Sequence, residues 1–427
     1  MKTKIWTILV ALMVISLLVF PASGSKPAAK EKEEFFTMYF WADMSRIYGF
    51  VNVPRLLGIQ DTIYWINKYK GGVQGRKFRV EWADHTNDLA VGATIYERWR
   101  ARKNFMFMGV CGSQENEAFH ERYAEDEVVV SSCGASETGI YPAGYPFATI
   151  PMYADQFANF ADYIVDRWDW KGKGRPPRLA FMTYDTPYGR ACLEPLVMEY
   201  AKKKRIEVVD TQYIPVVVVD AATPLTRAKK AGADYVYGQL TWMTLIPLVK
   251  GNDKLGYGLK FGTNNFGVDE PLPMLGGKPA EGVLGTTPYK LWAEKDDPFI
   301  QTMAKIAEEV GRRRKDLLNA YFLGVANVLT IYDLLNQLVP KVGWEGINGR
   351  LLRRQLETWG KEYDLHGLVK FDYTPDYRAP MTARLAEIKG GQWVPVTDWR
   401  RMPGLIRADL KGPYKEPSTP PKPKKAY

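Results

Sequence analysis

The chain has 427 residues, of which 46% are apolar and 25% charged, a composition typical of soluble globular proteins. Its length predicts two domains with a sizeable core. Much of the formal net charge of +10 lies near the two ends, and no basic stripe or nucleic-acid-binding module appears between them, which excludes nucleic acid as the partner.

The first 24 residues have the pattern of a secretory signal peptide. Lys2 and Lys4 form a basic start, residues 5–20 are almost wholly apolar, and small residues follow at 21–24. We expect cleavage after Gly24, export to the periplasm, and a linker over 25–34. An uncleaved anchor is the alternative, because the apolar run is near the lower limit for spanning a bilayer.

After the linker, apolar runs alternate with helical patterns along the chain. Strands are expected at 36–40, 78–82, 105–110 and 128–130, and again at 178–184, 206–209, 235–237 and 259–261. This alternation predicts an α/β fold of βαβ units, and its recurrence predicts two lobes with parallel central sheets. Residues 412–427, rich in proline and lysine, are expected to form a disordered tail.

Two neighbouring strands are predicted to end in small and polar residues. The first runs into Gly112 and Ser113, and the second into Ala135 and Ser136. Because parallel sheets bind ligands at the carboxyl ends of their strands, these residues would form a polar cradle suited to a carboxylate or an amide. Two ordinary turns are the alternative.

Cysteines stand at the ends of the same two strands. A bond between Cys111 and Cys133 would suit an oxidising compartment and stabilise the fold by roughly 3 kcal/mol in the chain-entropy model. Cys192 would then be a spare buried thiol. Three unpaired cysteines are the alternative.

The sequence carries no recognisable catalytic or metal-binding motif. Its three histidines lack metal-ligand spacing, and it has no nucleophile elbow, phosphate loop or dinucleotide fingerprint. The carboxylate pairs Glu115 with Glu117 and Asp269 with Glu270 are interpreted as solvated surface groups. We therefore expect no catalytic residue, no metal and no cofactor, and a protein that is not an enzyme.

Several motifs together resemble a known family. They are Ile66-Asn67-x-x-x-Gly71-Gly72-Val73-x-Gly75-Arg76, Gly112-Ser113, Ser132 to Ser136, Pro151-x-x-x-Asp155-Gln156, Tyr184-Asp185-x-x-Tyr188-Gly189, Ala231-Gly232-Ala233-Asp234 and Ala280-Glu281-Gly282. In this order and spacing the chain resembles the type I periplasmic solute-binding proteins of branched-chain (hydrophobic) amino acid ABC transporters, over residues 35–400.

The resemblance implies two Rossmann-like lobes joined by three crossover strands, near 153–155, 286–292 and 366–367. Lobe 1 would comprise 35–154 plus 288–365, and lobe 2 would comprise 155–287 plus 366–411. Such a protein is expected to be a monomer that closes on a small ligand and delivers it to the membrane permease subunits of an ABC transporter.

The resemblance also implies binding positions. Ser113 and Ser136 match the hydroxyls that hold a ligand carboxylate, with main-chain contacts from Gly134 and Ala135. Tyr48 and Tyr188 match aromatic residues that flank the ligand, although ordinary packing is the alternative for both.

One position departs from the family pattern. Amino-acid receptors carry an acid for the ligand ammonium where this chain has Asn264 and Asn265, and an unpaired buried ammonium is costly. We therefore expect a ligand other than a standard α-amino acid, unless Asp269 takes the place of that acid. Trp242 and Tyr184 would suit an apolar or aromatic ligand body.

Two other functions stay open at this point. A sensory protein that presents its closed form to a membrane receptor kinase would have the same sequence features. An enzyme on the same scaffold would need a reactive cluster that the sequence does not display.

Overall fold

The computed structural model describes residues 34–416. The predicted signal peptide, nearly all of the linker and residues 417–427 lie outside this range. Within it, one helix, α13 (Tyr321–Val342), is long and apolar enough to cross a membrane, but most of it is buried inside the protein. It is a core helix of the first lobe.

The first lobe is built on a five-stranded sheet with the strand order β2-β1-β3-β4-β5, in which every pair is parallel. Its elements are β1 (Phe35–Ala42), α1 (Gly49–Tyr69), β2 (Lys77–Asp84), α2 (Leu89–Arg100), β3 (Phe107–Val110), α3 (Ser113–Glu125), β4 (Val129–Ser132), α4 (Glu137–Ile140) and β5 (Pro146–Ala148). The central strands β3 and β4 are buried throughout, as expected for a parallel sheet covered on both faces.

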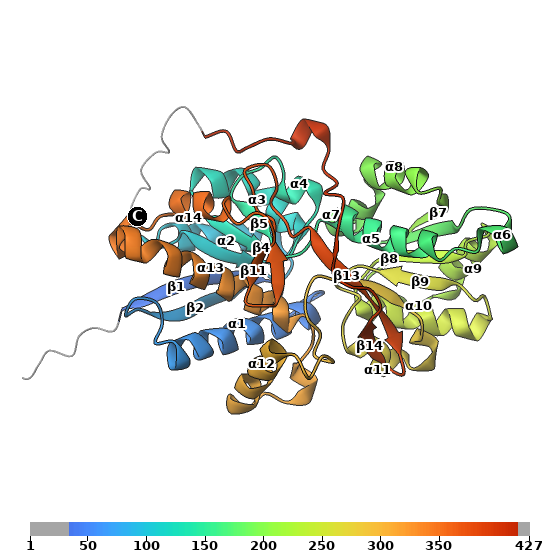
Figure 1. Cartoon of the computed structure of the whole chain (residues 1–427), viewed down its shortest axis with the longest axis horizontal. Helices are drawn as coiled ribbons and strands as arrows, with labels where there is room; N and C mark the ends of the chain where they lie inside the picture. The colour runs from blue at the N-terminus through green and yellow to red at the C-terminus, as the bar shows by residue number, and fades with distance from the viewer. Residues whose placement is uncertain (1–33, 417–427) are drawn as a thin grey trace, which may run out of the picture. The chain divides into compact units, whose positions relative to one another are not determined.

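The second lobe follows the same plan around a mixed sheet with the order β14-β13-β10-β9-β8-β6-β7 (Figure 1). Its elements begin with α5 (Tyr153–Asp166), α6 (Trp170–Lys173), β6 (Arg178–Thr183), α7 (Pro187–Arg190), α8 (Pro195–Lys203) and β7 (Glu207–Tyr213). They continue with α9 (Ala222–Lys230), β8 (Tyr235–Gln239), α10 (Trp242–Leu255), β9 (Lys260–Thr263), α11 (Pro271–Gly276) and β10 (Leu284–Thr287). The fold class predicted from the sequence, α/β with parallel central sheets, is confirmed, and antiparallel strands β13 and β14 extend the second sheet.

The chain then returns to the first lobe and finally to the second. The first lobe receives α12 (Pro298–Glu309), α13, α14 (Gly349–Leu356), β11 (Tyr363–Leu365) and β12 (Val369–Phe371), and the second receives β13 (Thr382–Lys389), β14 (Gln392–Pro395) and β15 (Arg400–Arg401). Helices α1 and α13 pack closely through glycines: a Cβ on Gly58 would lie 2.1 Å from the Tyr321 carbonyl oxygen. A Cβ on Gly324 would lie 1.9 Å from the Arg55 carbonyl oxygen, so neither site can hold a side chain.

The third crossing lies later than the predicted position at 366–367. Strands β11 and β12 form a hairpin on the first lobe, because Tyr363 Oη and His366 Nε2 both contact the Asp333 carboxylate on α13, each at 2.8 Å. Ala379 still belongs to the first core, and Thr382 begins β13 in the second sheet. The predicted boundary of lobe 2 at residue 366 is therefore corrected.

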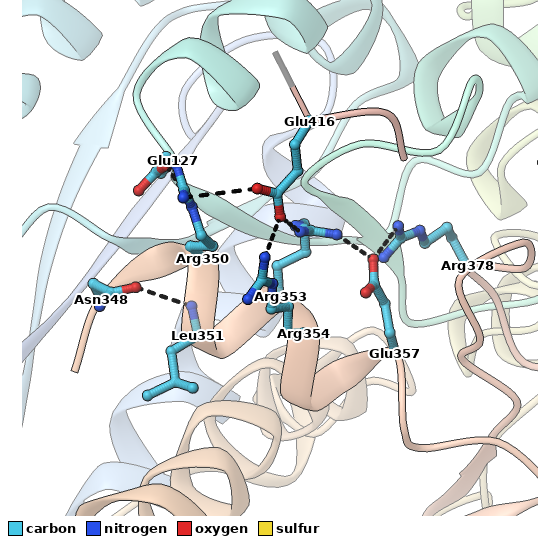
Figure 2. Close-up of polar contacts among 9 residues, drawn as sticks. All are labelled: Glu127, Asn348, Arg350, Leu351, Arg353, Arg354, Glu357, Arg378 and Glu416. Carbon is cyan, nitrogen blue, oxygen red and sulfur yellow. Dashed lines mark hydrogen bonds and ion pairs between the residues drawn. The ribbon is translucent and has the colours of Figure 1, made fainter. Parts of the chain in front are cut away.

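The segment after β15 runs back from the second lobe to the first. The backbone N–H groups of Gly404 and Leu405 donate to Asp155 Oδ1 at 2.9 and 3.0 Å. Further on, the Tyr414 ring packs against Tyr145, and Glu416 reaches the arginines of α14 (Figure 2). The predicted disordered tail therefore begins too early at 412, because its composition did not reveal that these residues have partners on the first lobe.

A disulfide joins Cys111 to Cys133. The register of the sheet pairs Val110 on β3 with Ser132 on β4, so the next residue of each strand faces the other. Cys192 is free and buried in the second lobe.

Candidate functional site

A cavity of about 90 Å³ lies between residues of the two lobes, with room for several water molecules or the body of a small organic molecule. From the first lobe and the start of α5 it is lined by Asp43, Tyr48, Val51, Asn52, Asn87, Cys111, Gly112, Ser113, Gln114, Glu115, Cys133, Gly134 and Tyr153, and from the second lobe by Thr186, Pro187, Tyr188, Thr241 and Phe266. The first-lobe residues follow the carboxyl ends of β1, β2, β3 and β4, the edge at which open parallel sheets bind ligands.

Ser113 places an unsatisfied hydroxyl at this edge. It is the first residue of α3 and only 2% exposed, and its Oγ makes no hydrogen bond of standard geometry. The nearby Tyr153 hydroxyl donates to the Cys133 carbonyl oxygen at 3.3 Å. With the N–H groups in the first turn of α3, of which that of Glu115 already donates to its own carboxyl group, Ser113 forms a site suited to an anion or a carbonyl oxygen.

Glycines allow the two strand ends to approach. A Cβ on Gly134 would lie 2.6 Å from the backbone nitrogen of Ser113, and Gly112 has a φ of 151°, a conformation that favours glycine. The disulfide joins the same two loops and also lines the cavity. This edge of the first lobe is thus held in place by a covalent bond and by close backbone contacts.

Three buried titratable side chains stand beside this edge. Asp43 accepts hydrogen bonds from the backbone nitrogens of Arg46 and Tyr48 at 2.9 and 2.8 Å. Glu115 is 5% exposed, and its Oε1 lies 3.3 Å from Nε2 of the buried His85. Burial raises the pKa of Glu115 to about 7, and burial lowers the pKa of His85.

The interpretation of Glu115 and Asp269 as solvated surface groups is therefore wrong. Glu115 lies in the first turn of α3, which faces the cavity because the helix begins at the ligand-binding edge. Asp269 is 3% exposed, and its Oδ1 accepts a hydrogen bond from the backbone nitrogen of Asn319 at 2.7 Å. The position of Glu115 directly after a predicted strand end is the sequence signal that would have indicated it.

Aromatic rings form the rest of the wall. The Tyr188 ring packs edge-on against Tyr153 and Phe266, with centroid distances of 5.2 and 5.6 Å. Its hydroxyl accepts a hydrogen bond from Asn264 Nδ2 at 2.7 Å, which fixes the ring. Tyr48 completes the group from the first lobe. These surfaces suit an apolar or aromatic body.

The structure brings together four of the eight predicted binding residues, namely Tyr48, Ser113, Gly134 and Tyr188. Ala135 and Ser136 do not line the cavity. The Ala135 carbonyl oxygen instead accepts from the Tyr153 backbone nitrogen, and Ser136 Oγ lies 3.3 Å from Glu117 Oε1. The sequence did not point to Asp43, Glu115, Tyr153 or Phe266.

Asn265 and Trp242 also lie outside this cavity. Asn265 lines a smaller neighbouring cavity that shares Val51 and Phe266 with the main one. Its backbone nitrogen donates to Gln156 Oε1 at 2.9 Å. The Trp242 ring packs edge-on against Phe50 of α1 at 5.0 Å, so it connects the two lobes.

Two α/β lobes, successive chain crossings and a cavity between the lobes define a type I periplasmic binding protein. A family model described as "Periplasmic binding protein" matches residues 41–392, and the chain belongs to that family. No curated protein sequence matches the chain.

Solved structures of binding proteins share this fold. One is a branched-chain amino acid ABC transporter protein from Thermus thermophilus with bound valine, at 19% identity and a TM-score of 0.78, with 88% of this chain and 98% of that chain covered. A second is a solute-binding protein from R. palustris in complex with 4-hydroxybenzoate, at 17% identity, a TM-score of 0.71 and coverages of 86% and 98%. A third is a fatty acid ABC transporter substrate-binding protein from Thermomonospora curvata, at 18% identity, a TM-score of 0.73 and coverages of 86% and 92%. At these identities the likeness concerns the fold alone.

Proposed function

We propose that the protein is a periplasmic receptor of an ABC importer that traps a small carboxylate- or amide-bearing solute and delivers it to the permease subunits. The observation that carries this proposal is the buried hydroxyl of Ser113 at the start of α3, which makes no hydrogen bond of standard geometry and lies in a cavity walled by residues of both lobes. Export through the N-terminal signal peptide and a monomeric state belong to the same proposal.

The proposed ligand class follows from the two kinds of group that line the cavity, polar groups at the start of α3 and aromatic rings. The α3 amides and Ser113 Oγ suit a carboxylate or amide oxygen, and the rings of Tyr48, Tyr153, Tyr188 and Phe266 suit an apolar or aromatic body. The valine and 4-hydroxybenzoate bound by two structural neighbours, and the fatty acid named for a third, all have a carboxyl group. This common feature supports the assignment of the α3 end of the cavity to that group.

On the second-lobe side, neither Asn265 nor Asp269 is placed to pair with the ammonium group of a standard α-amino acid. Asn265 does not line the cavity, and the Asp269 carboxylate is already occupied by the backbone nitrogens of Asn319 and Glu270, at 2.7 and 3.0 Å. Neither residue is therefore placed to neutralise a ligand ammonium beside Tyr188.

The test is a thermal-shift screen of the refolded, ligand-stripped protein, followed by calorimetric titration. The panel contains α-amino acids, their deaminated acids, aromatic acids and the matching amides. A ligand at a hundred times its Kd stabilises the protein by about 2.7 kcal/mol, which gives a measurable rise in Tm. If no member of the panel binds, the proposed ligand class is refuted.

A matched pair of variants locates the binding site. Ser113→Ala removes the unpartnered hydroxyl and is expected to weaken binding about tenfold, the value of one hydrogen bond. Ser136→Ala removes a hydroxyl that faces Glu117 outside the cavity, and its Kd should stay within about twofold of the wild type. If Ser136→Ala weakened binding more than Ser113→Ala, the ligand would lie beside Ser136 after β4, and the proposed site beside Ser113 would be refuted.

A further inference from the structure

The start of α3 carries an acidic group of its own. A Cβ on Gly112 would lie 1.6 Å from Glu115 Oε2, so the Glu115 carboxyl group folds back over the strand end that also presents Ser113. Among the residues that line the cavity, Asp43 and Glu115 are acidic, and none is a lysine, arginine or histidine. A ligand carboxylate beside Ser113 would therefore meet an acid, and no basic side chain of the cavity lining would offset that charge.

His85 faces Glu115 from the loop after β2. Its Nε2 is buried, makes no hydrogen bond and lies 3.3 Å from Glu115 Oε1. A neutral imidazole can accept the proton of a protonated carboxyl group at this distance. The other titratable groups that face the pair are Asp43 and Tyr48 from the loop after β1, Asp84 and Asp88 around the loop after β2, and Tyr123 on α3.

We propose that Glu115 is a specificity-determining residue: a ligand carboxylate binds beside Ser113 only when Glu115 is protonated, so ligand binding takes up one proton. This inference rests on the proposed function. It adds a charge rule, namely that the protonation state of Glu115 decides whether the site accepts a carboxylate. The proton comes from solvent and stays on the Glu115 carboxyl group, oriented toward His85 or the ligand oxygen. A neutral amide needs no such proton.

Electrostatic repulsion determines how the affinity for an acid changes with pH. Burial, with a smaller contribution from Asp43, raises the pKa of Glu115 to about 7, so the empty site is partly protonated at neutral pH. An incoming carboxylate raises that pKa further. The affinity for an acid should therefore fall about tenfold for each pH unit above 7, whereas the affinity for the matching amide should not change.

The experiment uses a matched set of 4-hydroxybenzoate, 4-hydroxybenzamide and 4-hydroxybenzylamine, and an aliphatic set of isovalerate, isovaleramide and isobutylamine. Titration calorimetry gives the Kd from pH 6 to 9. Parallel titrations of the wild-type protein in buffers of different ionisation enthalpy count the protons taken up. At pH 8 we expect close to one proton per acid bound and none per amide.

Glu115→Gln keeps the shape of the protonated carboxyl group and removes its titration. In this variant the Kd for the acid should become independent of pH, and at pH 8 the acid should bind about tenfold more tightly than to the wild type. Glu121→Gln changes an exposed glutamate on the same helix and should preserve the pH slope of the wild type.

The outcomes separate the two proposals. Acid binding without pH dependence, an unchanged slope in Glu115→Gln, or amine binding that weakens like acid binding when the pH rises from 6 to 8 would each overturn the role of Glu115 and leave the receptor function standing. Failure of every acid and amide in both sets and in the initial panel would overturn the proposed function, and the charge rule with it.

Discussion

The arginines around α14 allow a quantitative test of how burial controls ion-pair energy. Glu357 Oε1 accepts hydrogen bonds from Arg353 and Arg378, whose side chains are 4% and 0% exposed (Figure 2). Glu357→Gln would leave the buried Arg378 guanidinium group without its carboxylate and would leave Arg353 paired with Glu416 alone. Removing one partner of a buried pair costs about 3–5 kcal/mol, and we expect a loss of free energy of unfolding in this range, measured by urea denaturation.

Glu416 is the matched control because it contacts the same cluster from a more exposed position. It binds Arg353 at 2.7 Å and Arg354 at 2.9 Å, but its side chain is 31% exposed and that of Arg354 is 59% exposed. Glu416→Gln should cost about 1 kcal/mol or less, and 1 M salt should abolish that cost. Equal losses for the two variants, or a salt-sensitive loss for Glu357→Gln, would refute the reasoning from burial.

Three further predictions concern the site and its supports. Replacing both Cys111 and Cys133 by serine opens a link of sequence separation 22 and should lower the free energy of unfolding by roughly 3 kcal/mol in a non-reducing urea titration; an unchanged value would refute the disulfide. Gly112→Ala puts a side chain at a φ of 151°, which should distort the edge that presents Ser113 and weaken acid binding by more than about tenfold in calorimetry; a wild-type Kd would contradict the geometry. Burial raises the pKa of Asp155 to about 6, so its carboxyl group contributes about 3 kcal/mol of stability below pH 4 that is lost as the pH rises to 6. Asp155→Asn should remove that part of the pH dependence, and denaturation curves at pH 4.5 and 7 that differ as in the wild type would argue against it.

The sequence predicted the architecture and the first-lobe edge of the site because both depend on local pattern. Ser113 and Gly134 follow apolar runs that can only be buried strands, and parallel strands end at one edge. The same logic located Cys111 beside Cys133, since each directly follows its strand. Residues that directly follow a parallel strand can therefore be located without knowing how the lobes pack.

The missed residues depend on packing that local pattern does not encode. Phe266 lines the cavity, whereas the adjacent Asn265 lines its neighbour. The two residues lie in a turn in which the Gly267 N–H donates to the Asn264 carbonyl oxygen at 3.1 Å, so their side chains point in different directions, and an assignment displaced by one residue moves the predicted contact out of the site. Trp242 was predicted to contact the ligand because it is aromatic and follows a strand of the second lobe, but its ring packs against Phe50 instead.

The two lobes contribute different kinds of chemistry to the cavity. The polar groups that read a ligand's charge, namely Ser113, Glu115 and the α3 amides, all belong to the first lobe and are held by the disulfide and close glycine contacts. The second lobe adds the rings of Tyr188 and Phe266. Its hydroxyl groups already have partners: that of Tyr188 in Asn264, that of Thr186 in the Gly189 N–H and that of Thr241 in Tyr184. In the proposed mechanism the first lobe binds the ligand's charged end before closure, and burial by the aromatic rings of the second lobe then strengthens that electrostatic selection by excluding water.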